Sequence, residues 1–160
     1  MRFFLVPGAV LLAVPLAAQK PAAPPRPLPA AEQAAIFQAA GAVRRGRNWV
    51  ICTEDRSAAA RLDEVRDING DGRPEAIVAE DGLFCHGNTG TGFVLLSKQA
   101  NGRWLNLLAE TGIPQFLRGR GPGGWPDLSI GGPGFCFPVL RWNGRAYVQH
   151  RREYEGKPCR

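Results

Sequence analysis

Short apolar stretches, separated by Gly, Asn and Asp turns, follow one another along this chain from Trp49 onward. Each has four to six residues, a length typical of β-strands and too short for most helices. Two of the turns contain Asn-Gly, at residues 101–102 and 143–144, the dipeptide that most strongly favours a tight β-hairpin. The pattern predicts a mainly β fold of antiparallel hairpin units. The predicted strands are residues 49–52, 75–79, 92–97, 104–108, 127–130, 138–142 and 146–150.

One short N-terminal helix is predicted ahead of these strands. Residues 30–41 are rich in Ala and Gln, and Gly41 is a natural helix stop. Ile36 and Phe37 are the apolar side chains with which this helix would contact a sheet.

The first 29 residues have a different composition. Arg2 is followed by an uncharged apolar run up to Ala18, as in a cleaved secretory signal peptide. Residues 19–29 contain five prolines and favour an extended linker. We therefore expect a signal peptide at 1–18, a Pro-rich linker at 19–29, one β-rich domain at 30–160, and no transmembrane segment after cleavage.

Export would place the chain in an oxidising compartment, either the periplasm or the extracellular space. Its four cysteines, Cys52, Cys85, Cys136 and Cys159, are then expected to form two disulfides. Of the three possible pairings we favour Cys52–Cys85 with Cys136–Cys159, because each bond then closes a loop within one half of the domain. Metal binding by the thiolates is the alternative, but the sequence contains no C-x-x-C pair of the kind that favours it.

One segment is echoed later in the chain. Residues 73–78 read Arg-Pro-Glu-Ala-Ile-Val, and residues 125–130, at an offset of 52, read Trp-Pro-Asp-Leu-Ser-Ile. A Gly, a Cys and an Asn-Gly-Arg turn then follow in the same order in each copy. The echo predicts two similar β-units that bury their faces against each other.

The most distinctive motif is the stretch 67–75, Asp-Ile-Asn-Gly-Asp-Gly-Arg-Pro-Glu. Oxygen-bearing side chains at its positions 1, 3 and 5, with Gly at 6 and a carboxylate at 9, suit a hard cation. Residues 54–81 hold nine acidic residues and four arginines, a local charge of −5 in a chain of net charge +6. An EF-hand is excluded because its twelfth position requires Glu, whereas Val78 stands there and a predicted strand continues.

These residues resemble the FG-GAP or VCBS repeat of integrin-like β-propellers, in which a D-x-N-x-D-G-x-x-D/E loop joins two strands of a blade and commonly holds calcium. The resemblance covers about residues 61–82 well and 119–144 weakly. In the second copy the corresponding residues are Gly119, Gly121, Gly123 and Asp127, so no ion is expected there. In the first copy the resemblance implies the side-chain ligands Asp67, Asn69, Asp71 and Glu75, with the carbonyl of Arg73 as a backbone ligand.

Calcium is therefore the cofactor that we expect, in a structural role, and a metal-free turn is the alternative. Asn and Asp favour such turns without any ion, because their side chains bond to nearby backbone N–H groups. Two blades cannot close a propeller, which needs roughly four or more. The chain is expected either to fold as a compact pair of units or to associate with copies of itself.

Residues 119–138 form a second candidate surface, because they combine aromatic side chains with many glycines and prolines. Packing of the rings in the core is the favoured interpretation. The alternative is an exposed aromatic platform beside arginines, which would suit a glycan or another anionic envelope polymer. The candidate partner-binding residues are Trp125, Phe135, Phe137, Arg118, Arg120 and Arg141.

No catalytic motif accompanies these features. The sequence has no G-x-S-x-G, H-E-x-x-H or P-loop pattern, and its basic residues are scattered without a nucleic-acid-binding motif. We therefore predict a secreted or periplasmic, non-enzymatic module that binds an envelope or protein partner and no nucleic acid. The alternatives are a small inhibitor of an extracellular hydrolase and, less favoured, a hydrolase with an unrecognised carboxylate site.

Overall fold

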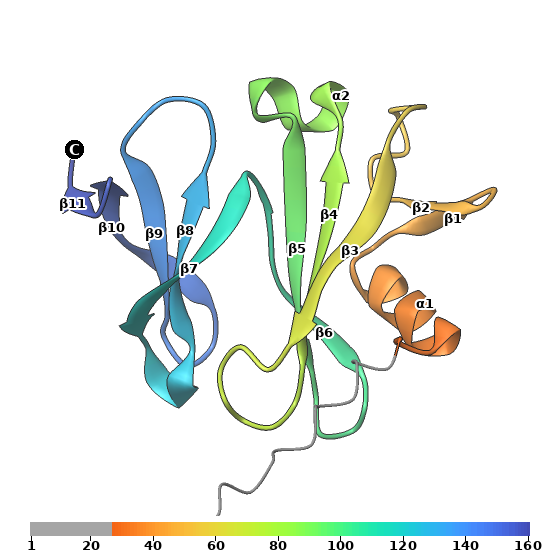
Figure 1. Cartoon of the computed structure of the whole chain (residues 1–160), viewed down its shortest axis with the longest axis horizontal. Helices are drawn as coiled ribbons and strands as arrows, with labels where there is room; N and C mark the ends of the chain where they lie inside the picture. Colours follow the sequence, from red (N-terminus) through yellow and green to blue (C-terminus); the bar gives the residue numbers. More distant parts are fainter. Residues whose placement is uncertain (1–26) are drawn as a thin grey trace, which may run out of the picture.

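A computed structural model describes residues 27–160, which form two antiparallel β-sheets with a short helix beside the first (Figure 1). The predicted signal peptide and most of the predicted linker lie outside the described residues. The elements are α1 (Ala30–Ala39), β1 (Val43–Arg45), β2 (Asn48–Val50), β3 (Ala59–Arg66), β4 (Glu75–Asp81), α2 (Leu83–His86), η1 (Gly87–Thr89), β5 (Thr91–Lys98), β6 (Trp104–Thr111), β7 (Ile113–Arg120), η2 (Pro122–Gly124), β8 (Pro126–Gly131), β9 (Phe137–Trp142), β10 (Tyr147–Tyr154) and β11 (Lys157–Pro158).

The strands follow the chain in a simple meander. The first sheet has the order β1-β2-β3-β4-β5-β6, and the second has the order β11-β10-β9-β8-β7. Gly112 alone separates β6 from β7, with φ of 143°. A side chain there would place its Cβ 2.4 Å from Cγ2 of Ile130, so the chain changes sheets at a point where only glycine fits.

Two four-stranded units, β3–β6 and β7–β10, share one connectivity (Figure 1). In each unit a long loop joins the first two strands, a loop with a disulfide cysteine joins the second and third, and an Asn-Gly hairpin joins the last two. Gly102 and Gly144, with φ of 80° and 101°, adopt the left-handed backbone that these hairpin turns require.

The core lies on both faces of the first sheet. On one face α1 packs Ile36 and Phe37 against Val78 and Leu96. On the other face Ile77, Phe93 and Leu95 pack against side chains of the second sheet, among them Trp125, Leu128, Ile130 and Tyr147. Strands β4 and β5 are therefore buried on both sides, which explains their nearly uninterrupted apolar sequences.

Both predicted disulfides are confirmed. Cys52 bonds to Cys85, and Cys136 bonds to Cys159. The first ties the segment after β2 to α2, and the second ties the β8–β9 loop to the C-terminal segment beyond β11. The pairing agrees with an oxidising environment.

The predicted elements differ from the observed ones mainly in their ends. Helix α1 stops at Ala39 rather than at residue 41, and β10 runs to Tyr154 rather than to residue 150. The strand predicted at 49–52 is β2, which ends at Val50. The sequence pattern missed β3 and β7 as well as the short β1, β11 and α2.

Candidate functional site

The loop between β3 and β4 carries the D-x-N-x-D motif and is held by its own hydrogen bonds. Oδ1 of Asp67 accepts the N–H groups of Gly70 and Asp71 at 2.7 and 3.2 Å, and Oδ2 accepts the N–H of Gly72 at 2.9 Å. These donors, that of Gly72 above all, lower the pKa of Asp67, although desolvation opposes them. Asp67 thus fixes the turn as an anion.

The next two motif residues also bond within the loop. Oδ1 of Asn69 accepts the N–H of Asp71 at 2.9 Å, and Oδ1 of Asp71 accepts the N–H of Arg73 at 2.8 Å. The Arg73 guanidinium forms an ion pair with Asp71 and donates a second hydrogen bond, of 3.1 Å, to the carbonyl of Lys98. The loop is therefore attached to the β5–β6 hairpin.

Glu75, at the ninth motif position, has a different environment. It is fully buried at the start of β4. Its Oε2 accepts the N–H of Ile68 at 2.8 Å, and its Oε1 accepts the Ser97 hydroxyl at 2.9 Å. Burial raises the pKa of Glu75, and the charge of Asp71 adds to this effect, while the bonds from Ile68 and Ser97 oppose it.

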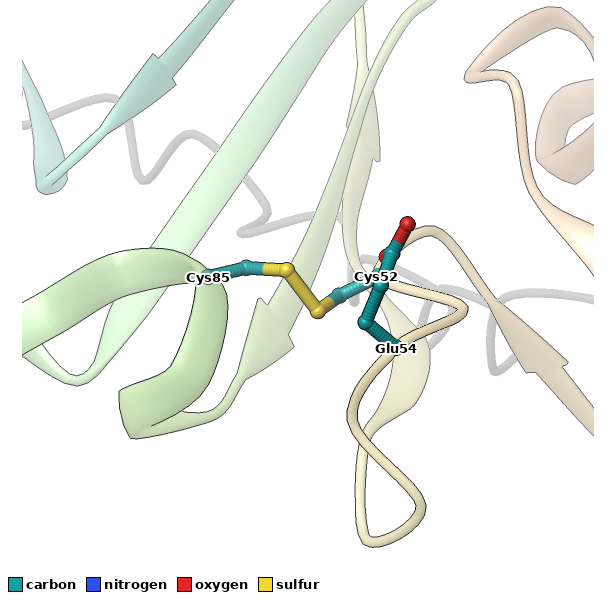
Figure 2. A group of neighbouring side chains, drawn as sticks. All are labelled: Cys52, Glu54 and Cys85. Atoms are coloured by element: carbon teal, nitrogen blue, oxygen red, sulfur yellow. A yellow bond between two sulfur atoms is a disulfide. The ribbon is translucent and has the colours of Figure 1, made fainter.

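The predicted cation ligands fit an ion only in part. Asp67, Asn69 and Asp71 carry oxygen atoms of the type that calcium prefers, but the Glu75 carboxylate is turned into the core. Among residues 27–160, the one group of three His, Cys, Asp or Glu ligand atoms within 4.8 Å of one another is Cys52, Glu54 and Cys85 (Figure 2). Its two cysteines are joined in a disulfide and so provide no thiolate.

An ion-pair cluster joins strands β8, β9 and β10 of the second unit. Asp127, fully buried, accepts hydrogen bonds from Nε and Nη2 of Arg141, both at 2.8 Å, and from Nη1 of Arg151 at 2.7 Å. The Arg141 bonds above all, together with those of Arg151, lower the pKa of Asp127 to about 2. Gly119 leaves room for this cluster, because a Cβ there would lie 2.4 Å from Oδ2 of Asp127.

The predicted partner-binding residues do not form one surface. Trp125 is only 7% exposed, and its ring lies 5.2 Å from that of Trp142 and 6.0 Å from that of Tyr147. Trp125 is therefore packed in the core, as the favoured interpretation of this segment predicts, and the exposed platform is wrong for this residue, because it continues the apolar layer between the two sheets.

The other five predicted residues are dispersed. Arg141 is used by Asp127, and Arg120 donates to the carbonyls of Ile68 and Gly124. Arg118 is exposed on β7, and Phe137 is half-buried on β9. Phe135, by contrast, is 76% exposed in the β8–β9 loop.

Phe135 has a counterpart that the sequence pattern did not single out. Phe84 is 72% exposed on α2, as is its neighbour Leu83. We call Leu83, Phe84 and Phe135 the apical surface, because α2 and the β8–β9 loop lie at the same end of the molecule (Figure 1). Each phenylalanine directly precedes a disulfide cysteine, so the repeated Phe-Cys dipeptide is the signal that points to them.

A buried polar link lies directly beneath α2. The carboxylate of Glu80, 1% exposed, accepts the N–H groups of Ile51 and Cys52, both at 2.7 Å. Nε2 of His86 lies 3.8 Å from Oε2 of Glu80, and Nδ1 lies 3.4 Å from the Thr111 hydroxyl. Glu80 and His86 thus place α2 beside β4, β6 and the segment after β2.

Comparisons with protein-family models, with curated proteins and with solved structures found no match to this chain. None of the helices within residues 27–160 is long and apolar enough to cross a membrane. The chemistry of its own residues therefore carries the functional interpretation.

Proposed function

We propose that this protein is an exported, non-enzymatic binding module that docks on a protein partner through the apical surface. The observation that supports this proposal most directly is the exposure of Phe84 and Phe135, at 72% and 76%, on two disulfide-tied loops. Large apolar side chains left exposed to solvent on ordered loops are candidates for interaction sites.

The disulfides also favour tight binding on energetic grounds. An aromatic ring on a constrained loop loses less conformational freedom on association than a ring on a flexible one. Rings of this kind, inserted into a pocket of the partner, supply a large share of the binding energy at protein interfaces. Glu80 and His86 extend the same constraint to α2 from below.

The secretory signal predicted at 1–18 accounts for how such a protein reaches an oxidising compartment. The FG-GAP or VCBS resemblance is retained as part of the proposal, supported by the shared connectivity of the two units. A calcium ion bound by Asp67, Asn69 and Asp71 is proposed to add to the stability of the loop. Its affinity is expected to be modest, because Glu75 is turned away and Arg73 already neutralises Asp71.

Affinity capture from envelope and culture-supernatant extracts tests the apical surface. The wild-type chain is immobilised beside the double variant Phe84→Ser, Phe135→Ser. The matched control is Val43→Ser, Ile113→Ser, which removes two other exposed apolar side chains, 50% and 58% exposed, on β1 and β7. Each chain is first shown to melt as the wild type does.

We expect one protein to be retained by the wild type and by the control, to be lost with the Phe variant, and to bind the purified wild type in a fixed ratio. Equal retention by the Phe variant would refute docking through the apical surface. Retention on envelope polysaccharide alone, unaffected by the Phe variant, would assign the polymer as the partner instead.

Inhibition of an extracellular hydrolase is the second candidate function. The specific observation in its favour is that the apical rings project from constrained loops, as is needed to enter a substrate cleft. If the captured protein is a hydrolase, stoichiometric addition of the wild type, and not of the Phe variant, should abolish its turnover. The hydrolase alternative for this chain itself is less favoured, since Asp127 is held by two arginines and Glu75 is buried.

A further inference from the structure

A pocket lies at the opposite end of the molecule from α2, where the loop at residues 67–74 and the hairpin turns of both units gather (Figure 1). Its volume is about 370 Å³, within the range of small-ligand sites, roughly 300–1,000 Å³. We call it the basal pocket; the lining residues that matter here are Asn69, Arg73, Gln99, Trp125, Trp142 and Arg145.

The apolar part of the basal pocket consists of tryptophan and leucine. Trp142, half-buried, tilts by 35° against Trp125, and Leu105 and Leu107 complete the apolar lining. Tyr147 packs behind both tryptophan rings, at 5.5 and 6.0 Å, so the aromatic wall is fixed before any ligand arrives. The face of the half-buried Trp142 ring suits the C–H face of a pyranose ring.

The polar part of the pocket offers both a donor and an acceptor. The amide oxygen of Asn69 is used by the N–H of Asp71, which leaves its NH₂ group as a donor. The NH₂ group of Gln99 is used by the carbonyl of Ser97, which leaves its amide oxygen as an acceptor. Sugar hydroxyls are donors and acceptors at once and can engage both groups.

The charge of the pocket favours an anion. Arg73 is compensated by Asp71, the one acidic residue that lines the pocket among the described residues. Arg145 is exposed in the Asn143 turn, and within residues 27–160 its guanidinium has neither an ion-pair nor a hydrogen-bond partner. A free guanidinium recognises a carboxylate through two parallel hydrogen bonds.

From the tryptophan wall, the two amides and the uncompensated arginine, we infer that the basal pocket binds a saccharide that carries a carboxylate, that is, a uronic acid unit of a polysaccharide. Trp142 contacts the sugar ring, Asn69 and Gln99 contact its hydroxyls, and Arg145 pairs with its carboxylate. The site is independent of the apical surface, so a protein partner and a uronate can occupy the molecule together.

Titration of the full chain with a galacturonic acid trimer, followed by calorimetry and tryptophan fluorescence, tests this site. The neutral galactose trimer, AMP and inorganic phosphate are titrated in parallel. Arg145→Gln removes the charge, and Arg103→Gln is the matched control, because Arg103 is exposed in the corresponding Asn-Gly-Arg turn of the first unit.

We expect the uronate trimer to bind and to perturb tryptophan emission, and Arg145→Gln to weaken it about tenfold, as loss of a charged hydrogen-bond pair would. Arg103→Gln should bind as the wild type does, and added salt should weaken the uronate. Equal affinity for the neutral trimer, or an unchanged Arg145→Gln, would overturn the inference. So would tighter binding of AMP or phosphate, which would assign a nucleotide or phosphate site, and so would an absence of binding at millimolar uronate.

Discussion

Replacement of Asp127 by Asn is the sharpest test of the ion-pair cluster in the second unit. Three guanidinium N–H groups, from Arg141 and Arg151, donate to this buried carboxylate. They lower its pKa from 3.8 to about 2. At about 1.4 kcal/mol for each pKa unit, this corresponds to about 2.4 kcal/mol of the free energy of unfolding.

The sign of the pH dependence follows from the direction of that pKa change. Because the folded-state pKa lies below the unfolded value, the stabilisation is complete well above pH 3.8 and is lost as the pH falls toward about 2. Asp127→Asn should therefore lose about 2–3 kcal/mol near neutral pH, and its difference from the wild type should shrink steadily in acid.

Urea unfolding of both chains, at a series of pH values from neutral down to acid, measures this difference. Asp63→Asn is the control, because Asp63 forms an exposed ion pair with Arg61 and should cost much less. A difference between Asp127→Asn and the wild type that stays constant from neutral pH to about pH 2 would refute the assignment of the stabilisation to the Asp127 charge.

Three further predictions concern the first unit. Replacing both Cys52 and Cys85 by Ser opens a bridge that spans 33 residues, and the free energy of unfolding should fall by about 3–4 kcal/mol in urea titrations; an unchanged value would contradict a constraining role. The raised pKa of Glu75 means that the contribution of this residue to stability falls as pH rises from 4.5 to the folded-state pKa; Glu75→Gln should lack that part of the pH dependence, and an unchanged pH dependence would contradict the destabilisation of the buried carboxylate. Gly92→Ala would place a Cβ 2.3 Å from the ring of His86, so we expect a lower melting temperature by calorimetry and weaker apical binding; wild-type behaviour in both would show that His86 does not position α2.

Local signals were sufficient to predict most of the fold. The Ala-rich helix, the Asn-Gly hairpins and the apolar strands β4 and β5 each depend on neighbouring residues, and all are present. Strand β3 was missed because its many charged residues conceal the alternation of apolar and polar positions. Among these charged residues, Arg61 forms ion pairs with Asp63 and Asp81 on the surface. Strand β7 was missed because it contains Pro114 and a glycine, which an edge strand tolerates.

The candidate sites depend on contacts that no local pattern contains. The sequence pattern placed the motif at residues 67–75 directly before a strand, yet the burial of Glu75 follows from its register opposite Ser97. The burial of Trp125 likewise follows from the packing of one sheet on the other. Phe84 lies in a glycine-rich segment that predicts only a loop. Its exposed position beside the Cys52–Cys85 disulfide is visible only in the folded chain.

The two units bury equivalent positions in equivalent places. At the repeat offset, Ala76 and Val78, which face α1, correspond to Leu128 and Ile130, which face the first unit. The units therefore stack in the same orientation, and α1 covers the first exposed face as a second sheet otherwise would.

The outward face of the second unit, opposite the face that packs on the first unit, is polar. The residue equivalent to the buried Ile77 is Ser129, and the same face carries Asp127 with its two arginines. An apolar sheet packed there would remove water from the partly exposed arginines. The new apolar contacts would not offset this desolvation cost. The charged cluster therefore gives the second unit a polar outer face, of the kind that repeat proteins place against solvent.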